Sequence, residues 1–319
     1  MGLSHPQRFI AHLFVKLISR ASDYPVSTLG NPFYIVDVFA EAKLEGNQLA
    51  VVIDKEGWPT EKMQKFTREM NFSESTFITG IDLEKRVFKV RIFTPVGELP
   101  FAGHPTLGTA YVAAKELLRK DVPDLTLDLR AGMIPVTFQT ASDGQPLLWM
   151  KQLSPEFGAV HRAEEIAPMF CLTPSDIDAR FPIQEVSTGV WFYIVPLKTR
   201  EALKKIKLDA EKLKAYSVDK KAKWPLLYCP EPENMGNDLK VRMLNDWTED
   251  PATGSANGCL AGYLVKHRYF GSPKIDIRVE QGAEINRPSI LYLRAEEKRG
   301  LIEVNVGGKV AMIARGELI

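Results

Sequence analysis

The sequence has few of the residues from which disulfide frameworks and metal sites are built. Its 319 residues include only three cysteines, an odd and widely spaced set: Cys171, Cys229 and Cys259. This pattern favours a reducing compartment, so we expect a cytoplasmic protein whose cysteines are buried small apolar residues. The five histidines never stand at the i,i+4 spacing of a zinc helix, and no phosphate-binding glycine motif is present. The sequence therefore predicts no metal, nucleotide or flavin cofactor.

A dominant charge and a long apolar run are also missing. The net charge of +1 creates no field that would steer nucleic acid or an anionic membrane toward the protein. Near the N-terminus, a basic amphipathic pattern places Arg8, His12, Lys16 and Arg20 at i,i+4 steps, but it is too short to span a bilayer. This segment could be a targeting sequence, a surface anchor or a docked helix. We expect residues 1–30 to be an extension, and we expect neither a nucleic-acid partner nor an integral membrane segment.

The most informative feature that is present is an internal repeat. Residues 89–104 resemble residues 240–255, and each copy reads as a strand, a turn and a run of small residues that opens a helix. The repeat predicts an N-terminal domain over residues 31–152 and a C-terminal domain over residues 153–319, with a final strand that could return to the first domain. The identical pairs are Lys89/Lys240, Val90/Val241, Arg91/Arg242, Glu98/Glu249, Pro100/Pro251 and Gly103/Gly254.

Strand-like patterns outnumber helical ones in each half. One long helix is predicted after each repeated loop, from Pro105 to about Lys120 and from Ser255 to about His267. A lysine-rich helix is predicted over residues 200–216. The pattern favours an α+β protein in which each half rolls a sheet around a central helix.

The start of each repeated helix could hold an anion. Gly103 and Gly254 let the backbone approach a ligand, and the N–H groups that follow combine with the helix dipole to favour a carboxylate. The alternative is that these glycines only permit tight packing, but their duplication favours a site. His104 and Ser255 follow the two glycines, so one helix start carries an imidazole that could pass a proton and the other carries a hydroxyl.

The two copies differ in their carboxylates. Asp250 stands where the first copy has Leu99, so only the second copy has an additional carboxylate before its proline. Glu98 and Glu249 are shared by both copies, which favours a structural role as partners of the shared arginines.

Glu74 breaks the repeat, because the residue 151 positions later is Pro225. It lies between Phe72 and Phe77, and partial burial there would raise the pKa of its carboxyl toward the range useful for a proton shuttle. The alternative is a solvated charge at a helix end, flanked by serines.

Several segments of the sequence form a recognisable set: Gly46-Asn47, residues 71–77, 91–106 and 249–255, Glu280-Gln281-Gly282, residues 287–289 and residues 306–308. Together they resemble the PhzF (phenazine biosynthesis-like) family. The resemblance covers about residue 33 to the C-terminus and implies the diaminopimelate epimerase-like fold. That fold has two pseudo-twofold-related domains with an active site between them and no cofactor.

The resemblance also implies roles for individual residues. Glu74 would be the acid/base that removes a proton from a substrate carbon and returns it elsewhere. Substrate would be bound or polarised by His104, Asp250 and Ser255, with weaker contributions from Ser73 and from the backbone at Gly103 and Gly254.

Related racemases in this fold use a cysteine before each glycine, whereas this chain has Ala102 and Thr253. The leading hypothesis is therefore a cofactor-independent isomerase acting on a small anionic carboxylate. The alternatives are an amino-acid epimerase or racemase with a different second base, and a binding or scaffold protein that retains the fold. A homodimer is a further expectation.

Overall fold

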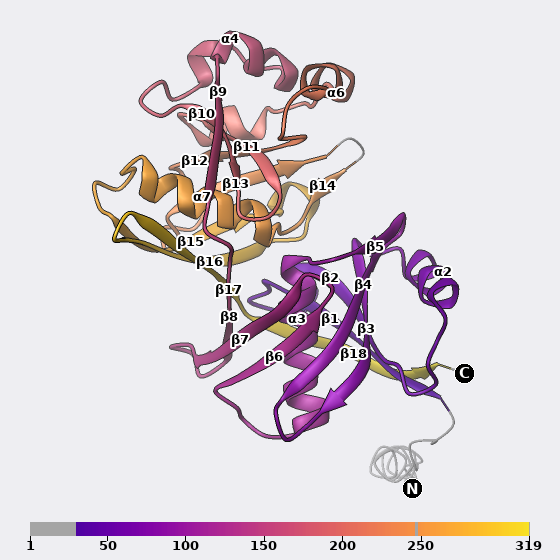
Figure 1. Ribbon diagram of the computed structural model, residues 1–319. Coiled ribbons are helices and arrows are strands. Elements are labelled where there is room, and N and C mark those ends of the chain that lie inside the picture. Colours follow the sequence, from indigo (N-terminus) through magenta and orange to yellow (C-terminus); the bar gives the residue numbers. More distant parts are fainter. Residues whose placement is uncertain (1–29, 246–247, 319) are drawn as a thin grey trace, which may run out of the picture.

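The structure is a computed structural model that describes residues 30–245 and 248–318, and the predicted N-terminal amphipathic segment lies outside them. The chain forms two lobes, the lower and upper parts of Figure 1. Within the described residues, one continuous 18-stranded sheet runs through both lobes.

The first lobe contains the helix α2 (Thr60–Met70), the helix α3 (Gly103–Val112) and a π-helical turn over Ala113–Leu118 that continues α3. Its strands are β1 (Asn31–Val38), β2 (Asn47–Ile53), β3 (Glu74–Asp82), β4 (Val87–Thr94), β5 (Gly97–Leu99), β6 (Asp124–Leu129), β7 (Gly132–Thr140), β8 (Pro146–Lys151) and β18 (Val310–Leu318).

The second lobe contains the helices α4 (Ala163–Ile166), α5 (Arg200–Lys204), α6 (Ala210–Ser217) and α7 (Gly254–Lys266), with 3₁₀ turns over Ala167–Phe170, Pro174–Asp176 and Ala283–Ile285. Its strands are β9 (Glu156–His161), β10 (Ile183–Ser187), β11 (Trp191–Pro196), β12 (Trp224–Cys229), β13 (Leu239–Leu244), β14 (Glu249–Asp250), β15 (Lys274–Gln281), β16 (Ser289–Lys298) and β17 (Leu301–Gly308).

The internal repeat is visible in the strand pairing. In the first lobe, β3 pairs in parallel with β2 and antiparallel with β4, which pairs with β5 and in parallel with β6. In the second lobe, β12 relates in the same way to β11 and β13, and β13 pairs with β14 and in parallel with β15.

The shared charges of the repeat are structural partners, as predicted. Arg91 makes two hydrogen bonds of 2.8 Å to Glu98, and Arg242 binds Glu249 at 3.0 and 2.7 Å. Each pair is bidentate, an arrangement that fixes the relative orientation of strand and turn. The same bidentate pair therefore links β4 to β5 in one copy and β13 to β14 in the other.

Each lobe has a central buried helix. All residues of α3 are buried except Tyr111, and α7 is buried except at Ser255 and Lys266. A helix that is buried all round must be enclosed by other elements, here by the strands of its own lobe. The predicted fold class, α+β with two related halves that each roll a sheet around a helix, is confirmed.

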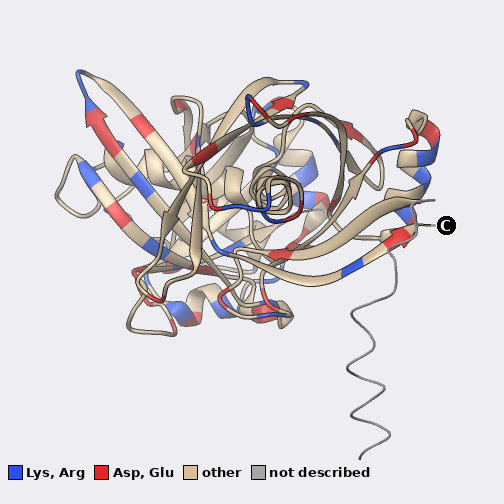
Figure 2. Cartoon of the chain, turned by 90° about the horizontal axis from the view of Figure 1, so that it is seen from below, with Lys and Arg blue, Asp and Glu red and all other residues tan. Residues whose placement is uncertain are grey.

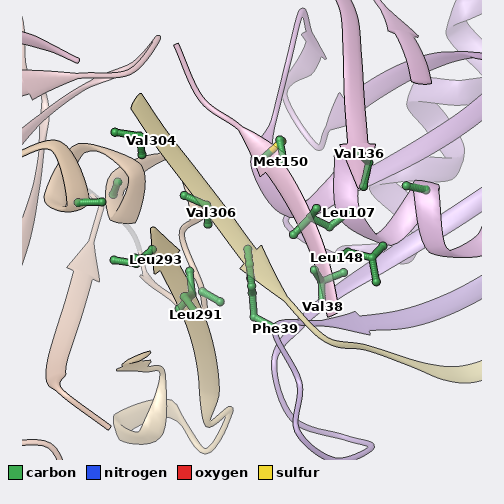
Figure 3. Packing of buried hydrophobic residues seen from close by; sticks show 14 of the residues in the cluster. Val38, Phe39, Leu107, Val136, Leu148, Met150, Leu291, Leu293, Val304 and Val306 are labelled. Carbon is green, nitrogen blue, oxygen red and sulfur yellow. The ribbon is translucent and has the colours of Figure 1, made fainter. Parts of the chain in front are cut away.

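The strand β17 joins the two lobes. It pairs with β16 of the second lobe and with β8 of the first, while the following strand β18 pairs with β1. Figure 3 shows Val304 and Val306 of β17 among buried apolar side chains from both sides, with Leu291 and Leu293 on one side and Phe39 on the other. One apolar cluster thus extends through both lobes. The positions of Lys and Arg are interspersed with those of Asp and Glu along the ribbon (Figure 2), in keeping with the small net charge.

The lysine-rich segment does not form the single helix predicted over residues 200–216. It forms α5 and α6, because two residues act as N-caps: the Thr199 hydroxyl accepts a hydrogen bond from the Ala202 amide, and the Asp209 carboxylate accepts one from the Lys212 amide. A cap residue in the middle of a helical pattern starts a new helix there.

The prediction that all three cysteines are buried is wrong for Cys171. This residue is exposed and has a φ of 54°, because it ends the 3₁₀ turn over Ala167–Phe170 in a left-handed conformation. Cys229 and Cys259 are buried.

In the part of the chain that the structure describes, no helix is long and apolar enough to cross a membrane. No group of three or more His, Cys, Asp or Glu side chains in that part is arranged to hold a metal ion.

Candidate active site

The starts of α3 and α7 lie against each other. A Cβ atom built on Gly103 would be 3.4 Å from Gly254 Cα and 3.4 Å from the Ser255 amide nitrogen. A Cβ atom on Gly254 would be 3.6 Å from Gly103 Cα and 3.2 Å from the Phe39 ring. The first N–H groups of a helix have no partner within it, so two sets of backbone donors that lack an intrahelical partner meet at this point. The two glycines leave that space open.

The carboxyl group of Glu74 lies at the same place. Glu74 begins β3 and His104 is the second residue of α3, and their Oε2 and Nε2 atoms are 3.5 Å apart. The Glu74 and His104 side chains are 16% and 6% exposed, and neither of these two atoms has a hydrogen-bond partner among the described residues. Buried polar atoms are nearly always paired in proteins, so this orphaned pair is a candidate for contact with a ligand.

Burial sets the protonation of both groups in opposite directions. It raises the pKa of Glu74 to about 8, and the nearby charge of Asp250 adds to this effect. It lowers the pKa of His104 to about 3, against the effect of a hydrogen bond to the Gln48 backbone. At neutral pH, Glu74 therefore carries a proton and His104 is a neutral imidazole. The upward shift predicted for Glu74 is confirmed.

Asp250 is the second carboxylate of the site. Burial raises its pKa to about 6, while hydrogen bonds from Thr253 and Asn47 act to lower it. The Thr253 hydroxyl donates to Oδ2 at 2.6 Å, and the Asn47 side-chain amide donates to Oδ1 at 2.9 Å. Asp250 is thus ionised at neutral pH while Glu74 is protonated, so the pair of carboxyl groups carries one negative charge, which lies on Asp250.

Three residues that hold Asp250 were not predicted to be functional: Asn47, Thr253 and Gln281. Asn47 and Gln281 stand in segments that carry the family resemblance, and Thr253 directly precedes the glycine of its loop. These positions in the sequence could have indicated a functional role. The contacts could not be predicted in the same way, because they join residues as distant in the sequence as Asn47 and Asp250.

The two predicted serines differ in their placement. Ser255 is half-buried at the start of α7, and its carbonyl accepts a hydrogen bond from the Thr188 hydroxyl at 3.4 Å. Its own hydroxyl makes no hydrogen bond within the described residues. Ser73 is exposed beside Glu74, and none of its described contacts joins it to the other predicted site residues. The structure thus brings together Glu74, His104, Asp250, Gly103 and Gly254, with Ser255 at the helix start and Ser73 at the margin.

Comparison with known families gives a match over most of the chain. The family described as "Phenazine biosynthesis-like protein" matches residues 36–316. The chain belongs to this family.

Curated relatives in the family are named as isomerases. The trans-2,3-dihydro-3-hydroxyanthranilate isomerase of Pseudomonas aeruginosa is 34% identical over 288 residues, covering 89% of this chain and 98% of that protein. An uncharacterized isomerase of Mesorhizobium japonicum is 33% identical over 313 residues, covering 90% of this chain and 98% of the relative. The predicted enzyme class, an isomerase, is confirmed at this level.

Solved structures support the family's fold. A PhzF-family phenazine biosynthesis protein of Bacillus anthracis aligns with a TM-score of 0.82 at 25% identity, covering 91% of this chain and 99% of that one. A probable proline racemase of Agrobacterium radiobacter aligns with a TM-score of 0.56 at 10% identity, covering 91% and 93% of the two chains. The second likeness concerns the fold alone, and together they confirm the predicted diaminopimelate epimerase-like architecture.

Proposed function

We propose that this protein is a cofactor-independent isomerase that moves a proton between two carbons of a small carboxylate substrate, with Glu74 as its single acid/base. The observation that carries the proposal is the pair of unpartnered atoms, Glu74 Oε2 and His104 Nε2, beside the joined starts of two helices. A carboxyl group whose pKa is raised to about 8 can both accept and return a proton near neutral pH.

The reaction is balanced within the substrate. Ionised Glu74 takes a proton from a C–H bond, and the electron pair of that bond moves into the substrate's conjugated system. The proton on Glu74, or one exchanged from water, is then delivered to a different carbon, so the product has the composition of the substrate. No electron leaves the molecule, so Glu74 alone can serve as the proton carrier.

The substrate is proposed to be an anion. The first N–H groups of α3 and α7 have no partner within their helices, and together they suit a carboxylate. His104 is neutral and adds no positive charge. The named Pseudomonas relative acts on trans-2,3-dihydro-3-hydroxyanthranilate, a carboxylate, which makes this compound the first probe. Because the two helix starts are in contact, we expect the lobes to separate for substrate to reach Glu74.

The chain offers no second base of the kind that a two-thiol racemase needs. The residues before the two glycines are Ala102 and Thr253, and the Thr253 hydroxyl is bound to Asp250. A single proton carrier favours transfer between carbons over inversion at one carbon.

The test is solvent deuterium incorporation in D₂O, first with trans-2,3-dihydro-3-hydroxyanthranilate and then with a panel of small carboxylates. We expect the wild type to convert at least one compound and to incorporate deuterium, and the Glu74→Gln variant to do neither while remaining folded. The Glu98→Gln variant is the matched control, because Glu98 belongs to the structural pair with Arg91, and it should retain turnover. Deuterium incorporation by Glu74→Gln at the wild-type rate would refute the assignment.

We also propose that the protein acts in the cytoplasm as a homodimer. Sedimentation of the purified full chain measures the oligomeric state, and a monomer at micromolar concentration would contradict this expectation.

A further inference from the structure

The carboxylate of Asp250 is held at both of its oxygens. Asn47, at the start of β2 in the first lobe, donates to Oδ1 and also to the Ala252 carbonyl at 3.1 Å. Thr253 donates to Oδ2, and the Gln281 side chain donates to the Asp250 backbone carbonyl at 2.8 Å. The donors are neutral, so the position of the carboxylate is set by hydrogen bonds and not by an ion pair.

The hydrogen bonds of Gln281 determine the direction in which the Thr253 hydroxyl points. The Gln281 Oε1 atom accepts from the Thr253 amide at 3.1 Å and from the Asn257 side chain at 3.0 Å, so its Nε2 must be the atom that faces Thr253 Oγ1 at 2.9 Å. Because Nε2 is a donor, it occupies an acceptor position of the hydroxyl. The hydroxyl proton is then left for Asp250 Oδ2, at 2.6 Å.

We propose that Gln281, acting through Thr253, is a positioning residue that commits the Thr253 hydroxyl proton to Asp250 and so assigns the buried negative charge to Asp250 and the mobile proton to Glu74. The inference rests on the proposed function, since it concerns which of the two carboxyl groups carries the proton. A hydroxyl that pointed away would leave a buried carboxylate oxygen without a donor.

The sequence repeat supports this pairing independently. The positions of Asp250 and Thr253 correspond to Leu99 and Ala102 in the first copy, so both polar residues occur in one copy and both are replaced by apolar residues in the other. A hydroxyl donor at this position has a carboxylate to serve only in the second copy.

The charged neighbours of Asp250 in the second lobe are Glu249, which precedes it in β14, and Arg242 of β13, which is paired with Glu249. The first lobe contributes titratable groups from two elements. Glu74 lies on β3 and His104 on α3, and Glu74 is the group whose pKa responds to the charge of Asp250. The titrations of Glu74 and Asp250 must therefore be followed together, because a change in the charge of one carboxyl group changes the pKa of the other.

The test is an NMR titration of protein labelled with ¹³C at Asp and Glu carboxyl groups, between pH 4 and pH 10, with no substrate. Glu74→Gln and Asp250→Asn each remove one signal and so assign the pair. The informative variants are Thr253→Val, which keeps the shape but removes the hydroxyl, and Thr253→Ser, which keeps the hydroxyl. Gln281→Met removes the donor to Thr253 and provides a second perturbation.

In the wild type we expect Asp250 to titrate below Glu74. Thr253→Val should raise the Asp250 midpoint by about one pH unit, the shift expected when one hydrogen bond to a charged group is lost. Thr253→Ser should leave the midpoint in place, and Gln281→Met should move it upward as well. An Asp250 midpoint that is the same in Thr253→Val as in Thr253→Ser would overturn the inference. A wild-type Glu74 that titrates near 4.5 would instead contradict the proposed function, so the two failures are distinguishable.

Discussion

Replacing Glu74 with glutamine should make the protein more stable, and the gain should depend on pH. The pKa of Glu74 is raised from 4.5 to about 8 in the folded protein, chiefly by burial. A folded state that binds its proton more tightly than the unfolded state is favoured at low pH, and this advantage is lost as the pH rises from about 4.5 to about 8. Glutamine is neutral and has no such loss.

The size of the effect follows from the same two values. A difference between 4.5 and about 8 corresponds to about 5 kcal/mol in the free energy of unfolding above pH 8. For a chain of this length that is an increase of roughly 5 to 10 °C in Tm. We expect Glu74→Gln and wild type to melt together near pH 4.5, and the variant to melt progressively later up to pH 8, where the difference levels off.

Thermal melts in matched buffers from pH 4.5 to pH 9 measure this difference. Glu98→Gln is a control of opposite sign, because its hydrogen bond with Arg91 lowers the pKa of Glu98, so its loss should destabilise the protein above the ordinary glutamate pKa. A Tm difference between Glu74→Gln and wild type that does not change with pH would refute the assignment of a buried protonated carboxyl group.

Three further outcomes follow from the site and its supports. Below about pH 8, kcat/KM should fall about tenfold per pH unit, because Glu74 must be ionised to accept a proton. His104 should contribute no step at its ordinary pKa of 6.5, since burial lowers its pKa to about 3. The Gly103→Ala variant should fold normally but have a kcat/KM lower by about 100-fold or more, because the added methyl group would cover the Ser255 amide. Unchanged kinetics would exclude that amide from the site. In chemical denaturation, Arg242→Met should lower the free energy of unfolding by about 3 to 5 kcal/mol and Arg91→Met by about 1 kcal/mol. The reason is that the Arg242 side chain is 9% exposed and the Arg91 side chain 27% exposed. Equal losses of stability would contradict this reasoning.

The sequence predicts the parts of the site that depend on local patterns. The repeat exposes the two helix starts, and the apolar neighbours of Glu74 indicate its raised pKa. The boundary between α5 and α6 was missed because the cap residue Asp209 stands inside a run of good helix formers. The sequence of β15 does have the alternation that predicts a half-buried strand, since its buried residues Ile275, Ile277 and Val279 alternate with polar residues.

Contacts between distant segments are harder to predict. The hydrogen bond of Asn47 to Asp250 depends on how β2 of one lobe meets β14 of the other, which no local pattern records. The orientation of Gln281 likewise depends on four hydrogen bonds to three residues, Asp250 in β14, Asn257 in α7 and Thr253 between them. Such networks need three-dimensional geometry, whereas the chemistry of each residue can be inferred from its type.

The path of the last two strands bears on how the chain is made. Since β18 pairs with β1, and β17 with β8, the sheet around α3 is completed only by residues 301–318, which follow the whole second lobe in the sequence. During synthesis the N-terminal half must therefore leave the ribosome with one edge each of β1 and β8 unpaired, and these edges are covered only after residues 301–318 have been made. A stop codon before residue 301 would leave both of those edges open and ready to pair with other nascent chains.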